Sequence, residues 1–156
     1  MRAALALVAA SLAVWPSLSC DQVNSMFAGL WRSTLPAASG PFAGAPELAI
    51  GHYGREIAGV AYFKIVQGGS EYVAECPCAF IENKRVDLDA RTVDFATKCD
   101  DLQLDWSLTL REEGTRRLLE GTVTRADGGP GSAEVQLERD DEFVRDEDKL
   151  CPPASP

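Results

Sequence analysis

The sequence predicts an all-β domain, an antiparallel up-and-down meander of about eight short strands that closes or nearly closes into a small barrel. Three observations predict it. Apolar and polar residues alternate with the period of strands beyond Glu47, turns rich in Gly and Asp separate the alternating runs, and no helix of useful length interrupts them. Because alternation shows that one face is buried but not how the sheet closes, an open sandwich also fits.

A short segment without clear strand character begins the domain. Residues 21–28 predict about one or two helical turns, with Asp21 as the N-cap. Residues 30–35 predict the first strand. Residues 36–46 are almost entirely Ala, Gly, Pro and Ser, with Phe42 the only large side chain, and predict an irregular loop. A loop of this length is usually a lid, a binding loop or a mobile segment.

The remaining strands form the body of the domain, residues 47–139. Strands are expected from Glu47 to a turn at Gly54-Arg55, and then over residues 57–65, 72–81, 92–99, 102–111, 117–124 and 133–138. Pro77 should place the second half of its segment at a sheet edge or a bulge. Residues 86–91 predict a turn. An acidic, Pro-rich tail, residues 140–156, follows and would be pinned by Cys151.

The clearest strand signal lies in residues 102–111, where five large apolar residues alternate strictly with polar ones. Such a strand has one dry face and one wet face. The dry face should be the wall of the interior, where Leu104, Trp106 and Leu108 either fill a core or, in a hollow barrel, contact a ligand.

The first 19 residues have the pattern of a secretory signal peptide. Arg2 supplies a positive start, and residues 3–14 form an apolar stretch too short to span a bilayer. Ser17-Leu18-Ser19-Cys20 resembles the lipobox of bacterial lipoproteins, in which the cysteine receives diacylglycerol and becomes the new N-terminus. In that family an aliphatic residue stands three places before the cysteine, where this chain has Ser17.

Cys20 is therefore the expected lipidation site. Ordinary signal peptidase could cut the same bond, after a small-x-small site, and release a soluble chain. The five cysteines favour the lipid, because an odd number cannot all pair in an oxidising compartment and lipidation of Cys20 leaves four that can. We expect an exported protein anchored to the bacterial cell envelope, with a soluble periplasmic or secreted protein as the alternative.

A second resemblance concerns the domain itself. A helical start, Gly29-Leu30-Trp31 entering the first strand and an up-and-down meander are similar to lipocalins and the wider calycin superfamily. The resemblance implies that Trp31 closes the narrow end of the barrel against Arg139 of the last strand. It also implies a disulfide from Cys151 to Cys76 or Cys78. The Thr-Asp-Tyr motif and the long C-terminal helix of classical lipocalins are absent from this sequence.

The four cysteines after Cys20 predict structural disulfides. A hairpin centred on Asp89 brings Cys78 almost opposite Cys99 and leaves Cys76 for Cys151. Cys-Pro-Cys lacks the two intervening residues of a redox pair, and a zinc site would need closer cysteines or more histidines than this chain supplies. We expect no metal and no cofactor.

The net charge of the chain and the lack of catalytic or metal-binding motifs disfavour several further classes of function. Only Arg2 among the charged residues lies in the leader, so the mature chain has 24 acidic and 14 basic residues, a formal charge of −10. Such a surface repels nucleic acid. The single histidine, His52, is expected at the surface or in a turn and has no serine motif beside it, which disfavours a catalytic triad. The acidic tail lacks the glycine and spacing of an EF-hand, leaving weak calcium binding as a minor alternative.

These observations favour a non-enzymatic envelope lipoprotein that binds a small apolar ligand or a protein partner. A structural or interaction module with a filled barrel is the alternative, and a hydrolase is a distant third.

Overall fold

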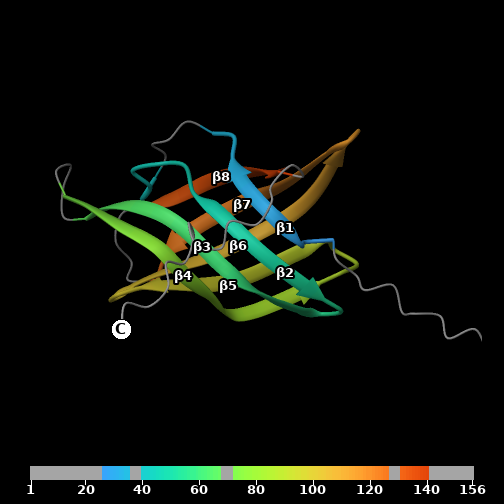
Figure 1. Ribbon diagram of the computed structural model, residues 1–156, viewed down its shortest axis with the longest axis horizontal. Coiled ribbons are helices and arrows are strands. Elements are labelled where there is room, and N and C mark those ends of the chain that lie inside the picture. The colour runs from blue at the N-terminus through green and yellow to red at the C-terminus, as the bar shows by residue number, and fades with distance from the viewer. Residues whose placement is uncertain (1–25, 36–39, 68–71, 127–130, 141–156) are drawn as a thin grey trace, which may run out of the picture.

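Eight strands make up the part of the chain that this computed structural model describes, which comprises residues 26–35, 40–67, 72–126 and 131–140. They lie side by side in Figure 1 and are labelled in chain order. Their bounds are Gly29–Ser33 (β1), Glu47–Tyr53 (β2), Glu56–Gln67 (β3), Tyr72–Asp87 (β4), Thr92–Cys99 (β5), Leu102–Glu113 (β6), Arg116–Arg125 (β7) and Ser132–Asp140 (β8).

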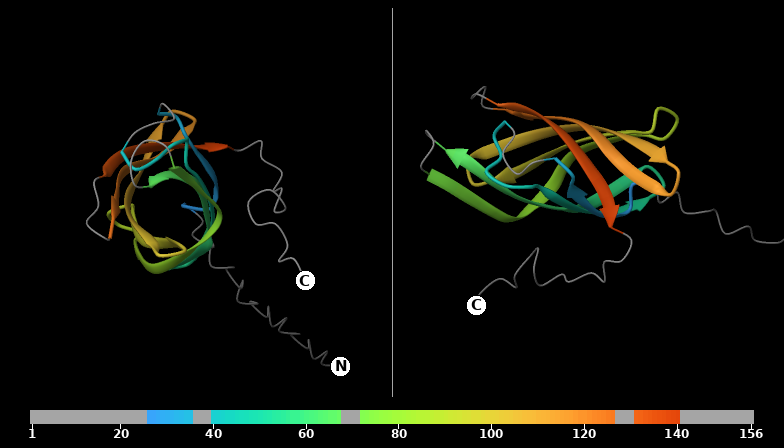
Figure 2. Two further views of the ribbon diagram at one scale, coloured as in Figure 1. Left: turned by 90° about the vertical axis from the view of Figure 1, so that its left-hand side faces the viewer. Right: turned by 90° about the horizontal axis from the view of Figure 1, so that it is seen from above.

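The strands form one closed antiparallel barrel in which each pairs with the next and β1 pairs with β8. The view along the barrel shows the ring of strands directly (Figure 2, left). The predicted all-β meander is thus confirmed, and closure excludes the open sandwich. No helix of the described residues is long and apolar enough to cross a membrane.

Alternation along the strands divides the molecule into an interior and an outer face. In β6 every second residue is buried, from Leu102 through Trp106 to Leu110. The burial of each large apolar side chain stabilises the fold by about 1.5–3 kcal/mol before the entropy cost is counted. The inward assignment of this strand is therefore correct.

Aromatic rings fill the centre of the barrel around Trp106, which is 1% exposed. Its ring stacks on Phe95 with centroids 5.6 Å apart, and lies 5.8 Å from Phe42 and 6.3 Å from Phe63. Its indole N–H donates a 2.9 Å hydrogen bond to the hydroxyl of Thr97, a fully buried threonine. This hydrogen bond offsets the cost of removing the one polar atom of the ring from water, so the ring can occupy the core.

The loop before β2 closes one end of this interior. Phe42 is 2% exposed and forms a bridge with Ile65 of β3. Two backbone hydrogen bonds hold the segment on β3, from Ala43 N–H to the Lys64 carbonyl and from Val66 N–H to the Pro41 carbonyl. The one large side chain of the small-residue loop is thus a plug for the core.

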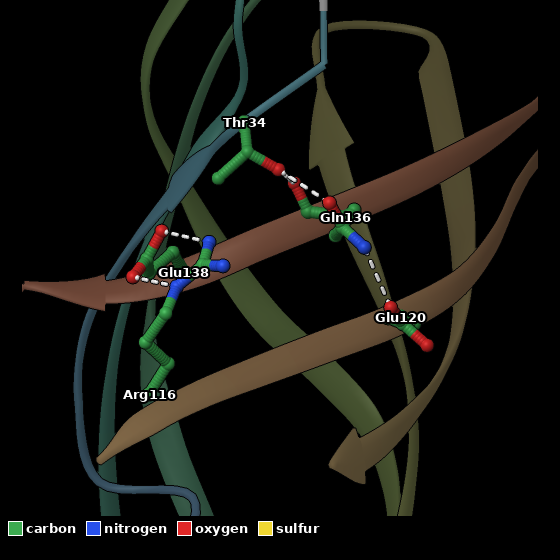
Figure 3. A network of polar contacts seen from close by, with 5 residues as sticks. All are labelled: Thr34, Arg116, Glu120, Gln136 and Glu138. Atoms are coloured by element: carbon green, nitrogen blue, oxygen red, sulfur yellow. Dashed lines mark hydrogen bonds and ion pairs between the residues drawn. The ribbon is translucent and has the colours of Figure 1, made fainter. Parts of the chain in front are cut away.

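A polar network on the outer face supports the seam where β7, β8 and β1 meet (Figure 3). Gln136 accepts a 2.8 Å hydrogen bond from Thr34 and donates one of 2.6 Å to Glu120. Arg116 donates two hydrogen bonds of 2.7 Å to the carboxylate of Glu138. The hydrogen bonds from this guanidinium lower the pKa of Glu138 and stabilise its charged form.

Two predicted elements differ from the structure. β4 continues to Asp87, so residues 82–87 belong to a strand, and the turn predicted from residue 86 begins only at Leu88. The strand persists because a bulge between Glu82 and Arg85 absorbs the irregular sequence. Met26 and Phe27 form a turn, and Asp140, the first residue of the predicted tail, belongs to β8. Residues 21–25 of the predicted helical start, the leader and residues 141–156 lie outside the described residues.

Replacement of Trp106 by Ala should lower the free energy of unfolding by about 3–5 kcal/mol, because it leaves a large void among rings that cannot collapse. Urea unfolding followed by circular dichroism measures the loss. Ser107→Ala, which removes only an exposed hydrogen bond to Asp94, is the control and should cost roughly 1 kcal/mol or less. A loss below about 1 kcal/mol for Trp106→Ala would show that its contacts are not those of a packed core.

Candidate functional site

The N-terminal end of the barrel brings together the two residues implied by the lipocalin resemblance. Trp31 is fully buried and pairs in register with Arg139 of β8. The Arg139 side chain passes over Gly29, where a Cβ atom would come within 2.9 Å of its Nε atom. Gly29 also has a φ of 139°, a conformation that L side chains rarely adopt. The glycine therefore gives the arginine room to cross this end of the barrel.

Phe27 plugs the same end and is held by Trp31 and His52. The Trp31 indole N–H donates a 2.9 Å hydrogen bond to the Phe27 carbonyl. The Phe27 amide donates one of 3.3 Å to Nδ1 of His52, and the two rings lie 5.3 Å apart. His52 Nε2 is 2.9 Å from the Gly54 carbonyl, which assigns its proton to Nε2 and leaves Nδ1 as an acceptor.

The expectation of a surface histidine is therefore wrong. His52 is 7% exposed, because it points inward from β2 in the same alternation as Leu48 and Ile50. Both ring nitrogens are engaged by backbone groups, so the imidazole holds the N-terminal segment against the β2–β3 turn. The sequence signal for this placement was the alternation itself, which continues through His52 up to the turn.

The predicted pairing of Cys78 with Cys99 is also wrong, because Cys76 forms the disulfide with Cys99, with Cα atoms 5.9 Å apart. The cause is a bulge in β4. Ala61 and Phe63 of β3 pair with Ala79 and Cys76, so two steps along β3 match three along β4. The bulge at Pro77 and Cys78 shifts the alternation by one residue, and Cys76 and Ala79 both face the interior.

Cys78 is disulfide-bonded too. Since Cys76 and Cys99 bond to each other, the predicted pairing of Cys76 with Cys151 is wrong as well. Cys20 and Cys151 lie outside the described residues.

The residues predicted as possible ligand contacts all lie in the packed interior. Leu104 is fully buried, and Trp106 and Leu108 are each 1% exposed. All three belong to one cluster with the rings around Trp106 and with Phe27 and Trp31 near the end. These residues supply packing to each other and close the interior to the outside.

A hollow of about 280 Å³ lies at β5, β6 and β7. It was not foreseen from the sequence. Its polar lining consists of Asn83, Asp94, Asp105, Ser107, Thr122 and Thr124. The register places Ser107 between Asp94 and Thr122, and Asp105 beside Thr124, so these side chains share the outer face. Asn83, at the bulge in β4, has a φ of 48°, a conformation that Asn tolerates better than most residues.

The two carboxylates make the hollow a set of hydrogen-bond acceptors. Asp94 accepts a 2.7 Å hydrogen bond from Ser107, and Asp105 accepts one of 2.8 Å from Gln103. A carboxylate has about four lone-pair positions, so each can accept further donors. Hydroxyls of Thr122 and Thr124 lie beside them. This combination suits a cationic group that carries several N–H donors.

Comparison with protein-family models, with curated proteins and with solved structures yields no match to this chain. Among the described residues, no group of three or more His, Cys, Asp or Glu side chains is placed to hold a metal ion.

Proposed function

We propose that this chain is an exported, lipid-anchored protein of the bacterial cell envelope that acts without catalysis, as a rigid interaction module. Its barrel is a filled scaffold, and its outer face binds a protein partner. The observation that carries the proposal is the packing of Trp106 against three rings, since an interior occupied by its own side chains leaves the outer surface as the place to bind.

The hollow at β5, β6 and β7 is the surface we assign to the partner. Two carboxylates lie there beside exposed hydroxyls, and an interface of this type receives Lys or Arg side chains. The mature chain's charge of −10 would attract a basic partner and increase the rate of association.

The lipid on Cys20 would hold the module at the membrane surface. The leader supports export, and the Ser19-Cys20 pair resembles a lipobox. Phe27, seven residues after Cys20, is held by Trp31 and His52, so an anchor at Cys20 would connect to a fixed point of the barrel.

We expect Cys20→Ala to abolish membrane attachment in a bacterial host. In a detergent phase separation, wild-type protein should enter the detergent phase, whereas the variant should stay in the aqueous phase because it lacks acyl chains. Mass spectrometry of the N-terminal peptide provides the control. Recovery of both proteins from the aqueous phase would contradict the anchor.

Charge reversal in the hollow should weaken partner binding. A photoreactive amino acid at Thr122 should cross-link to an envelope protein in intact membranes, and the yield should fall by about tenfold or more when Asp94 and Asp105 are both changed to Lys. Glu56→Lys, a charge reversal at the exposed first residue of β3, is the control and should leave the yield unchanged. Equal yields from the hollow variant and the control would contradict this assignment.

A further inference from the structure

An apolar row crosses the outside of the barrel on the side away from the hollow. The register pairs Asp140 with Leu30, Leu30 with Ala49, Ala49 with Val60, and Val60 with Phe80. Directly opposed residues point to the same face, and the residues next to them along the strands, such as Trp31 and Leu48, point inward. We call Leu30, Ala49, Val60 and Phe80 the outer row.

The two ends of the outer row differ in exposure. Phe80 is 66% exposed, whereas Leu30 is only 4% exposed although it points outward and lies outside the core cluster. The ion pair of Arg32 with Asp140 lies near Leu30, but these side chains are themselves 48% and 28% exposed. A leucine on the outer face of a five-residue strand needs further cover, and the chain leaves β8 at Asp140, directly beside it.

The opposite end of the row lies beside Cys78. Phe80 is two residues further along β4, and Cys78 is disulfide-bonded although its partner is neither Cys76 nor Cys99. Only Cys20 and Cys151 remain. The row therefore leads from the last described residue of β8 to a cysteine that is bonded to a terminal segment.

We infer that the C-terminal segment, residues 141–151, crosses the outer face of β1, β2 and β3 along the outer row and is fastened to β4 by a disulfide between Cys151 and Cys78. The lengths agree. Four strand spacings separate β8 from β4, about 19 Å, and the eleven residues from Asp140 to Cys151 can reach about 36 Å when extended.

The apolar residues of the segment are spaced to match the row. Phe143 and Val144 follow Asp140 by three and four residues, a reach of about 10–14 Å, or two to three strand spacings. Because neighbouring side chains of an extended segment point to opposite sides, Phe143 would lie against Ala49 while Val144 points away, and Leu150 would lie next to the disulfide and Phe80. Burial of Phe143 and Leu150 against the row supplies the driving force, and the acidic residues between them remain in water. Closing the disulfide from two thiols transfers two electrons and two protons to a disulfide oxidant by thiol–disulfide exchange.

The pairing is tested on full-length protein purified from its own membrane. Non-reducing peptide mapping should link the peptide that contains Cys78 to the one that contains Cys151. A link between Cys78 and Cys20 would overturn the inference, and so would a free Cys151 thiol. Detergent partitioning of the same sample tests the anchor separately, so a failure of the inference is distinguishable from a failure of the proposed function.

Limited trypsin digestion tests the path of the segment, which contains cleavage sites at Arg145 and Lys149. Val60→Asp should increase the cleavage rate at these sites by about tenfold, because a charge in the row weakens the docked state. Ala58→Asp is the matched control. It places the same charge on the same face of β3 but outside the row and should change the rate by less than about twofold. Equal rates in the two variants would overturn the path.

Discussion

The packing of Trp106 inside a closed eight-stranded ring is the constraint on which the remaining structure depends. A barrel of this size has room for side chains or for one small ligand. Here Phe42, Phe63 and Phe95 surround the indole, and Thr97 satisfies its N–H. The barrel's own side chains fill this space. A single arrangement of these rings must therefore be compatible with the strand register, with the loop that carries Phe42 and with closure of the sheet.

Closure of the barrel depends on β1, its shortest strand. β1 has five residues and joins β8 to β2, so it provides few backbone hydrogen bonds for the task. Side chains on the inner and outer faces of β1 add to the few backbone hydrogen bonds. Inside, Trp31 is fully buried and its indole holds the Phe27 carbonyl, while outside Arg32 forms ion pairs with Glu47 and Asp140. Exposed ion pairs contribute little each, so the buried tryptophan is the stronger of the two supports.

The outer surface carries two chemically different features. The outer row from Leu30 to Phe80 is apolar and follows β1 to β4, whereas the hollow at β5 to β7 contains Asp94 and Asp105 among hydroxyls. A tail on the outer row would protect it from aggregation, since exposed apolar patches promote association. The hollow would then remain accessible on a module for which we propose an N-terminal lipid anchor.

Most of the fold could be predicted from the sequence, because alternation reports directly which side chains are buried. Residues 102–111 are the clearest example, and their inward face is the wall of the core. Disulfide pairing could not be predicted in the same way. The extra residue at Pro77 and Cys78 places Cys76 and Ala79 on the same inner face, where regular alternation would put them on opposite faces, and the sequence pattern carries no information on where such a shift falls. Pro77 did indicate a bulge, but its effect on Cys76 required the register.

The candidate site was less predictable for a related reason. Asp94, Asp105 and Thr122 are far apart in the sequence and meet only because three neighbouring strands have a particular register. His52 shows a different case, in which a local pattern was present but the predicted surface position was wrong. It continues the inward alternation of β2, yet a polar residue beside a turn is usually placed at the surface.

Titration of the wild-type protein with an apolar fluorescent probe tests the filled interior most directly. The account predicts no saturable binding and no energy transfer from Trp106, because Phe42 and Phe27 close the two ends and the rings occupy the space between them. Trp106→Phe, which keeps a ring in the core, provides the control for transfer from the other tryptophans. Saturable uptake of one probe per chain, with quenching that is lost in Trp106→Phe, would contradict the account and establish a hollow, ligand-binding barrel.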